Sequence, residues 1–424
     1  MRGKKILIIA RDFIPYYHSL GGVLRVFKMA KFFDAQGFEV FILAAKGEEI
    51  SYFGYQKAIK NLNVNYIPDM LQYYNTRKYN QEKKKLDPSM ISKTSLARKV
   101  KGFLIELSIP DLGIYFFQKF VREGIRIIEE YSIRNVIVSS PPHSTQLIGF
   151  KLKKRFQDRI NLIVDYRDSW NTTGIFQKRC SIFKGFSERL EKRILKVSDH
   201  FVYHSPPVLN KINSKFVDIT HKSLLVMNGF DSSIKLTAQR IFANNNEYLT
   251  IGHFGAIHEK ANSFRNPKLL FEALLKLNQK IKVVFYGTTR INEIWQKRSK
   301  DMIEIKGTVS HEAAVQLMQE MDVLMLLHSE REGADEVIPA KLFEYILAEK
   351  PILVVGPENM EAARIVRNNG LGYTINLYDE DDILDKMNTI HDEWGRAALP
   401  RYKWQDFRKF SRDYQYSKLL GILE

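Results

Sequence analysis

Two glutamates set eight residues apart, Glu336 and Glu344, have the spacing that says most about chemistry. Pro339 lies between them, and proline favours the first turn of a helix, so we expect a helix that begins there and ends before Pro351. On one continuous helix, side chains eight residues apart would point about 80° away from each other. With the helix beginning at Pro339, Glu336 lies ahead of it and Glu344 lies on its second turn. Both can then face a ligand beyond the helix N-terminus.

A helix start of this kind can bind a pyrophosphate group. Its first backbone N–H groups are free and its dipole is positive there, so it can hold phosphate without a metal ion. Glu344, one turn inside, can accept hydrogen bonds from a ribose diol, which leaves Glu336 for the hydroxyls of a sugar. The spacing also allows a simpler interpretation, in which Glu336 caps the helix and Glu344 is an ordinary surface charge.

Three charged residues, Asp165, Arg167 and Asp168, directly follow an apolar segment, residues 162–164. We expect this segment to be a buried strand, and open α/β sheets bind ligands at the carboxyl ends of their strands. The three side chains are therefore candidate active-site residues. The alternative is an internal Arg–Asp ion pair that only shapes the loop.

A glycine pair, Gly21 and Gly22, follows the first predicted strand and precedes a helical pattern over residues 23–33. Without side chains, their backbone can approach a phosphate or an acceptor closely. A simple turn from loop to helix would need no ligand, and that interpretation stays open.

The elements that carry these residues alternate between short apolar runs and longer amphipathic segments, which is typical of parallel α/β sheets. The pattern restarts after residue 247, which predicts two doubly wound Rossmann-like domains. We expect an N-terminal domain over residues 1–235, a C-terminal domain over residues 236–403, and a terminal helix over residues 404–424 that packs back on the first domain. The predicted strands cover residues 6–10, 40–44, 136–139, 162–164, 249–253, 282–286, 323–327 and 352–355.

The charge of the chain is unevenly distributed. Residues 1–235 contain 40 Lys and Arg against 21 Asp and Glu, a net charge of +19, whereas residues 236–424 contain 25 against 27, a net charge of −2. This asymmetry predicts that the first half meets an anionic partner, such as a membrane surface, a pyrophosphate-linked acceptor or nucleic acid. An irregular, Lys-rich segment, residues 46–108, is either a membrane-surface element or a solvated insertion. A solvated basic surface without a partner is the remaining alternative.

The cellular compartment is inferred from what the sequence lacks. No apolar run reaches the ~18 residues that a membrane-spanning helix needs, and the N-terminus has no signal-peptide cleavage pattern. A single cysteine, Cys180, cannot form an intrachain disulfide or a multi-cysteine metal site. We therefore expect a cytoplasmic protein, and the basic first half predicts peripheral attachment to the inner face of the membrane.

The glutamate segment resembles the signature of glycosyltransferase family 4, retaining enzymes of the GT-B fold. Other segments agree in order along the chain. Gly21-Gly22 is similar to the family's glycine loop, Asn228-Gly229-Phe230-Asp231 resembles its interdomain turn, and residues 307–312 resemble its base-contacting region. A subgroup also carries the string Asp165-Tyr166-Arg167-Asp168-Ser169-Trp170 together with the Ser-Pro-Pro-His-Ser loop found here at residues 140–144.

The resemblance implies a role for each matching residue. Glu336 would be a catalytic residue that positions the donor sugar. Lys341 and Glu344 would bind the donor, Arg265 would hold its pyrophosphate, and Thr308 and Val309 would contact its base. His143, Asp165, Arg167 and Asp168 would form the acceptor wall. Relatives often carry an arginine where this chain has Ala256, so phosphate binding falls to Arg265, Lys341 and the helix start.

The implied reaction transfers a sugar from a UDP- or GDP-linked donor to an acceptor hydroxyl with retention, without a metal or other cofactor. The expected context is bacterial cell-surface polysaccharide or glycolipid synthesis, with a glycan or lipid-linked acceptor. A GT-B nucleotide-sugar epimerase and a non-catalytic nucleotide-sugar binder remain alternatives. A nucleic-acid binder is disfavoured because the sequence contains no recognisable nucleic-acid-binding motif.

Overall fold

The computed structural model describes residues 4–17, 20–50, 59, 62–84, 108–173, 181–234, 247–261, 263–299 and 302–423. The chain forms two compact units. Unit 1 comprises Met1–Val226 with Tyr416–Glu424, and unit 2 comprises Met227–Gln415. The predicted boundary near residue 235 borders a segment, residues 235–246, that lies outside the described residues.

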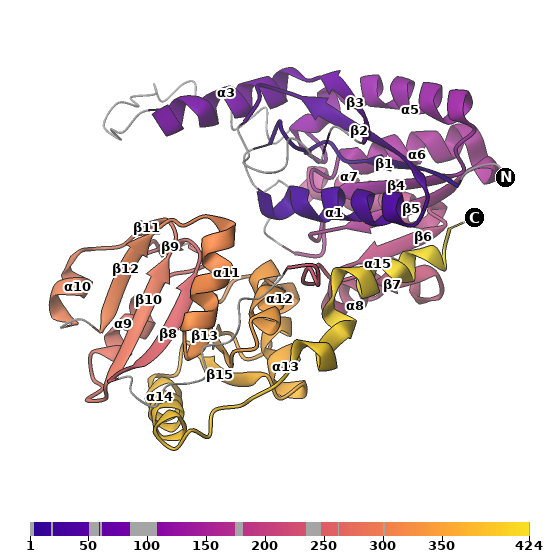
Figure 1. The fold of residues 1–424 in the computed structure, drawn as a ribbon. Helices are drawn as coiled ribbons and strands as arrows, with labels where there is room; N and C mark the ends of the chain where they lie inside the picture. The colour runs from indigo at the N-terminus through magenta and orange to yellow at the C-terminus, as the bar shows by residue number, and fades with distance from the viewer. Residues whose placement is uncertain are drawn as a thin grey trace. The chain divides into compact units, whose positions relative to one another are not determined.

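Unit 1 is built on a seven-stranded parallel sheet with the strand order β3-β2-β1-β4-β5-β6-β7. Its strands alternate their side chains between two apolar layers, as the two-residue period of a strand requires. Figure 1 shows the sheet in violet tones. The strands are β1 (Lys5–Ile9), β2 (Glu39–Lys46), β3 (Asn63–Pro68), β4 (Asn135–Ser140), β5 (Asn161–Tyr166), β6 (His200–Tyr203) and β7 (Ser223–Leu225).

Helices cover both faces of this sheet. Leu7 and Ile9 of β1 pack in one layer with α5, α6, α7 and α8. Ile6 and Ile8 pack in the other layer with α1 and α15. The helices are α1 (Leu20–Ala35), α3 (Met70–Lys84), α5 (Phe117–Tyr131), α6 (Thr145–Phe156), α7 (Ser181–Val197), α8 (Pro206–Lys215) and α15 (Arg412–Leu420).

Unit 2 is built on a six-stranded parallel sheet with the order β12-β10-β8-β13-β14-β15. A separate short parallel pair is formed by β9 (Ile257–His258), which follows β8 in the chain, and β11 (Thr289–Arg290), which follows β10. The main strands are β8 (Leu249–Phe254), β10 (Ile281–Tyr286), β12 (Ile303–Gly307), β13 (Val323–Leu327), β14 (Ile352–Gly356) and β15 (Gly372–Asn376).

The second sheet is also covered on both faces (Figure 1). Leu324 and Val354 pack with α12 and α13, whereas Val323 and Leu353 pack with α9 and α14. The helices of unit 2 are α9 (Lys268–Leu274), α10 (Ile294–Arg298), α11 (His311–Glu320), α12 (Ala340–Leu347), α13 (Glu361–Asn368) and α14 (Glu380–Gly395).

All eight strands that the sequence predicts are present. The strands that it missed are mostly half-buried. β3, β7, β12 and β15 lie at or beside a sheet edge, and many of their residues are only partly buried. Such strands lack the continuous apolar run that marks a buried parallel strand, which is why the pattern did not reveal them.

The two sheets share a topological feature that bears on function. The strand order reverses between β1 and β4 in unit 1 and between β8 and β13 in unit 2. In doubly wound sheets, ligands bind beyond the carboxyl ends of the strands at this switch point. Both candidate sites of the sequence analysis follow strands at or next to these points.

The predicted terminal helix is interrupted. A 3-10 helix over Trp404–Phe410 ends where Ser411 forms a β-bridge with Phe230, and α15 begins at the next residue. The bridge takes backbone groups that a continuous helix would have used internally, because Arg412 N–H donates to Phe230 O at 2.8 Å. The last residues pack on unit 1, where Asn161 Nδ2 donates to Ile422 O at 2.7 Å.

Part of the irregular segment 46–108 is regular in the structure, which has β3 and α3 there. Residues 85–107, which include the end of the Lys-rich run and the proposed membrane-surface stretch, lie outside the described residues. No helix in the described part of the chain combines the length and hydropathy needed to cross a bilayer.

Candidate functional site

The glutamate pair lies around the start of α12, as the sequence predicts. Pro339 is the N-cap residue, α12 runs over Ala340–Leu347, and it ends before Pro351. Glu336 closes a 3-10 helix over Ala334–Glu336 ahead of this helix and is buried. Glu344 lies on the second turn and is partly exposed, with Oε1 4.0 Å from His311 Nδ1. Proline therefore separates the two carboxylates as expected.

Lys341, on the first turn of α12, extends over the end of β8. A Cβ added to Gly255, the residue that follows β8, would lie only 1.6 Å from Lys341 Nζ. The ammonium group thus occupies the space that a side chain at position 255 would fill. Burial, together with the nearby guanidinium of Arg265, lowers the pKa of Lys341 to about 7. The site therefore holds a cation that is costly to keep charged without an anion.

Arg265 and His253 complete this region. Burial lowers the pKa of Arg265 and holds the pKa of His253 well below its usual value. His253 Nδ1 lies 3.0 Å from Met325 O, and because a carbonyl only accepts, Nδ1 carries the proton. Nε2 is then an acceptor, 3.4 Å from the position of a Gly255 Cβ. The cations Lys341 and Arg265 and the buried acceptor His253 Nε2 therefore lie together beside the start of α12, at the β8/β13 switch point.

Ser329, which follows β13, holds the Arg265 loop on both sides. Its Oγ accepts a hydrogen bond from Asn266 N–H at 3.0 Å, and its own N–H donates to Phe264 O at 2.8 Å. Arg331 also stacks over the Phe264 ring at 4.0 Å. The loop that carries Arg265 is therefore tied to the carboxyl end of β13.

The predicted base-contacting residues, Thr308 and Val309, lie in an exposed loop between β12 and α11. This loop is joined to the Lys341 region through glycines. Gly287 N–H donates to Gly307 O at 2.6 Å, and a Cβ at Gly287 would meet the Gly255 carbonyl at 2.6 Å. The structure thus places Thr308, Val309, Arg265, Lys341 and the glutamate pair at the carboxyl edge of one sheet.

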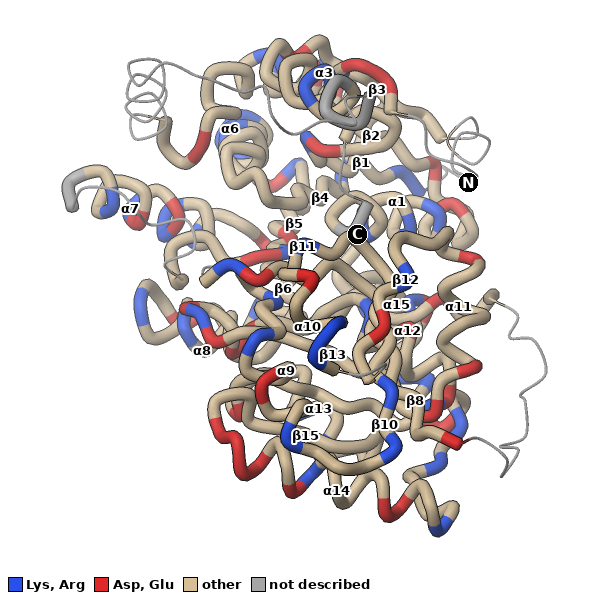
Figure 2. Tube along the Cα trace, turned by 90° about the vertical axis from the view of Figure 1, so that its left-hand side faces the viewer, with Lys and Arg blue, Asp and Glu red and all other residues tan. Residues whose placement is uncertain are grey.

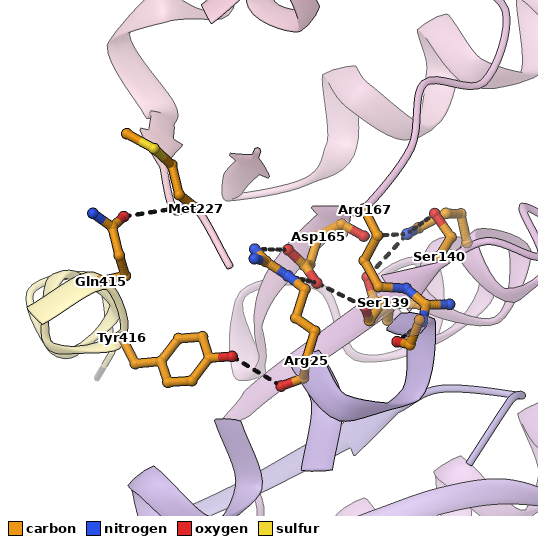
Figure 3. Close-up of polar contacts among 11 residues, drawn as sticks. Arg25, Ser139, Ser140, Asp165, Arg167, Met227, Gln415 and Tyr416 are labelled. Carbon is orange, nitrogen blue, oxygen red and sulfur yellow. Dashed lines mark hydrogen bonds and ion pairs between the residues drawn. The ribbon is translucent and has the colours of Figure 1, made fainter. Parts of the chain in front are cut away.

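In unit 1, Asp165 is fully buried at the end of β5 and forms an ion pair. Arg25 of α1 donates from Nη2 to its Oδ1 at 2.8 Å, and Ser139 Oγ donates to its Oδ2 at 2.6 Å (Figure 3). Burial alone would raise the pKa of Asp165, but the charge and hydrogen bonds of Arg25 outweigh it and lower the pKa. The arginine partner is Arg25, which the sequence analysis did not single out.

Arg167 joins the start of α1 to two loops of unit 1. It donates from Nη1 to Gly22 O and from Nη2 to Pro141 O. Gly21 and Gly22 lie in the first turn of α1, so the helix begins earlier than the pattern predicted. A Cβ at Gly22 would lie 3.0 Å from Arg167 Nη1, which explains why the position suits glycine. Arg167 thereby brings the first turn of α1, the Pro141 loop and the Asp165 loop together.

His143 and Asp168 differ in burial. His143 is buried, stacks on Trp170 with ring centroids 5.3 Å apart, and has Nδ1 3.2 Å from Ser140 Oγ. Burial lowers its pKa to about 4, so it is neutral at physiological pH. Trp170 is itself fixed to α7, where its Nε1 donates to Ser187 Oγ at 3.1 Å. Asp168, by contrast, is exposed on the loop surface.

Asp12 is a residue that the sequence analysis missed. It follows β1, is buried, and burial raises its pKa to about 6 despite the nearby charges of Arg11 and Arg167. A titratable group with a raised pKa beside a strand end is a functional-site candidate. The signal was available, because Arg11 and Asp12 directly follow an apolar strand just as Asp165 does.

Residues 241–403 match the model of the family described as glycosyl transferases group 1. This range contains Arg265, Lys341 and both glutamates, and the match supports glycosyl transfer as the activity. A comparison of the sequence with curated proteins finds no match.

Solved structures resemble the whole chain. Sucrose-phosphate synthase from Thermosynechococcus elongatus has a TM-score of 0.65 at 12% identity, over 99% of this chain and 98% of that one. The lipopolysaccharide outer core galactosyltransferase WaaB, in its apo form, has a TM-score of 0.64 at 12% identity, over 99% of each chain. HepE from Anabaena, in complex with UDP and glucose, has a TM-score of 0.62 at 13% identity, over 99% of each chain. The protein has the GT-B fold. The predicted fold class is confirmed, with two parallel-sheet domains.

Proposed function

We propose that this protein is a retaining glycosyltransferase that moves a sugar from a nucleoside diphosphate sugar to an acceptor hydroxyl. The observation that carries the proposal is the position of Lys341 Nζ over Gly255, beside Arg265 and the start of α12. The family match of this unit and the UDP bound by the structural neighbour HepE support a nucleotide sugar as the donor.

The donor pyrophosphate lies, in this proposal, between Lys341, Arg265 and the first N–H groups of α12. A buried lysine with a pKa of about 7 gains most from an anion, because the anion restores the charge that burial disfavours. Arginine adds a bidentate contact to phosphate. Glu344 accepts hydrogen bonds from the ribose hydroxyls, and Thr308 and Val309 contact the base.

The mechanism that follows needs only this chain's charged groups. Negative charge develops on the leaving phosphate as the bond to the sugar breaks, and Lys341, Arg265 and the helix dipole stabilise that charge. The acceptor hydroxyl attacks from the face that the phosphate leaves and gives its proton to that phosphate, which retains the anomeric configuration. Glu336 positions the sugar hydroxyls, and His253 Nε2 accepts a hydrogen bond beside them.

Unit 1 carries the acceptor in this proposal. The segments joined by Arg167, the start of α1 and two loops, follow β1, β4 and β5, which include the switch-point strands of that sheet. Asp12, with its raised pKa, and the exposed Asp168 are the acidic groups there that can bind acceptor hydroxyls. Asp165 and His143 support these loops from inside, because both are buried and bonded to neighbouring elements.

A lipid-linked or glycan acceptor at an anionic membrane fits the charge of unit 1. The exposed basic residues of α7 are Arg189, Lys192, Arg193 and Lys196, and Phe186 of the same helix is 58% exposed. Figure 2 marks basic positions along α7 in blue. Such a helix face binds anionic lipid through charge, and salt weakens the attraction. We propose a role in bacterial cell-surface polysaccharide or glycolipid synthesis. Vesicle binding that persists at high salt would contradict the electrostatic part of this proposal.

Activity tests separate the two glutamates. Glu336→Ala is expected to abolish transfer with little loss of UDP or GDP binding, because it contacts the sugar. Glu344→Ala is expected to weaken nucleotide binding, because it contacts the ribose. A panel of UDP- and GDP-sugars is screened first by thermal shift, where a ligand at ~100 times its dissociation constant adds about 2.7 kcal/mol of stability. Normal transfer by both variants would overturn the assignment.

A further inference from the structure

A cavity in unit 2 is lined by residues to which no role has been assigned above. It has a volume of about 480 Å³ and opens at the carboxyl ends of β13, β14 and β15. The residues that line it include Glu330, Glu358, Asn359, Arg367, Asn376 and Tyr378. None of them belongs to the Lys341 region. Its size falls within the ~300–1,000 Å³ that small-molecule sites occupy.

Tyr378 gives the cavity a rigid aromatic wall. Its side chain is 49% exposed, so part of the ring surface is open to a ligand. The ring is nevertheless held in place. Tyr378 Oη accepts a hydrogen bond from Glu330 N–H at 2.8 Å, and Tyr378 N–H donates to Asn376 Oδ1 at 3.1 Å. The first bond holds the ring and the second holds its backbone, so the side chain loses little entropy when a ligand stacks on it.

The polar groups around the ring are carboxylates, amides and one guanidinium. The carboxylates of Glu330 and Glu358 are exposed, and neither forms an ion pair with any residue in the described ranges. Asn376 uses Oδ1 for the Tyr378 backbone, so its amide N–H groups remain as donors. Arg367 donates from Nη2 to Glu358 O at 3.1 Å, which fixes the guanidinium against the cavity rim.

The charge of the cavity limits its ligand. Two glutamates and one arginine leave a net negative charge, which disfavours phosphates, nucleotides and carboxylates. Carboxylates and amides pair well with neighbouring hydroxyl groups, each of which donates and accepts. The exposed face of an aromatic ring covers the C–H side of a flat, partly apolar ring. A hydroxyl-rich ligand with one apolar face satisfies all three features.

We propose that this cavity binds a neutral hexopyranose unit, with Tyr378 as the stacking platform and Glu358 and Asn376 as hydroxyl partners. The inference does not depend on glycosyl transfer, because it concerns binding at residues outside the donor and acceptor assignments. The sugar is either a free monosaccharide or one unit of a longer glycan, and the same chemistry serves both.

Saturation-transfer NMR on the full chain, without any nucleotide sugar, tests the proposal. The probes are the methyl glycosides of glucose, galactose, mannose and N-acetylglucosamine at ~10 mM, which suits a dissociation constant of ~1 mM. At least one glycoside is expected to receive saturation. Maltose, cellobiose and lactose form a second arm, in which tighter binding than the monosaccharide identifies a unit of a longer glycan and equal binding identifies a single sugar.

The variants locate the binding. Tyr378→Ala and Glu358→Ala should each weaken it about fivefold or more, whereas Tyr378→Phe, which keeps the ring, should retain most of it. Tyr248→Ala is the matched control. Tyr248 is 39% exposed and directly precedes β8, so it lies at the amino end of a strand, whereas the cavity lies at the carboxyl ends. If Tyr378→Ala fails to fold, the exposed Glu358 carries the test. Absence of saturation with every probe, or binding that survives both alanine variants, overturns the proposal.

Discussion

Lys341 Nζ occupies the volume of the side chain that Gly255 lacks, since a Cβ at position 255 would lie 1.6 Å from it. Gly255→Ala must therefore displace the ammonium group. We expect affinity for UDP or GDP to fall about tenfold or more, the loss of one hydrogen bond to a charged group. Calorimetric titration measures the effect. Gly185→Ala in α7 is the matched control, because a Cβ there meets nothing within 4 Å and alanine favours a helix.

The pKa of Lys341 predicts how donor binding depends on pH. This pKa is about 7 in the free protein, so the ammonium loses its proton as the pH rises through 7. A bound diphosphate favours the charged form. The contribution of this lysine to donor affinity is therefore complete below pH 7. Above pH 7 the affinity falls by up to about tenfold per pH unit, until the pH reaches the higher pKa that Lys341 has in the complex.

A charge-retaining variant isolates this effect. Lys341→Arg stays protonated throughout, so its affinity for UDP should change little between about pH 7 and 9, where the terminal phosphate, with a pKa of ~6, is already ionised. The comparison uses the pH slope rather than the absolute affinity, because arginine is larger. A wild-type affinity that stays constant over this range would refute the role of Lys341 as the titrating cation.

Ser329 is predicted to position Arg265. Ser329→Ala removes the 3.0 Å hydrogen bond from Asn266 N–H but keeps the backbone bond to Phe264 O. We expect nucleotide affinity to fall severalfold and the free energy of unfolding to fall by about 1 kcal/mol. Ser329→Thr keeps the hydroxyl and should restore affinity. A purely structural role would lower the melting temperature of Ser329→Ala and leave its nucleotide affinity unchanged.

The Arg25–Asp165 pair is predicted to be strongly coupled. Both side chains are almost fully buried, so removing one partner leaves an uncompensated charge. Asp165→Ala and Arg25→Met should each cost about 3–5 kcal/mol in urea unfolding. The double variant Arg25→Met/Asp165→Leu should cost much less than the sum of the single changes. Additive losses would mean that the two groups act independently of each other.

Local features explain how far the sequence could be interpreted. The start of α12 was predictable because proline fixes its own backbone angle and cannot donate, whatever surrounds it. The buried strands were predictable because a parallel strand covered on both faces must be apolar at nearly every position. The break at Ser411 was not predictable, because it arises from a bridge to Phe230, far away in the chain.

The sequence by itself determined the two parallel sheets, the proline between Glu336 and Glu344, and the loops in which charged residues follow strands. These depend on periodicity and on neighbours along the chain. Only the tertiary structure decided which partners those residues take. Asp165 pairs with Arg25, 140 positions away, and Lys341 lies over Gly255. Such contacts depend on which strand ends are adjacent in the sheet, and the order of strands in space differs from their order in the chain.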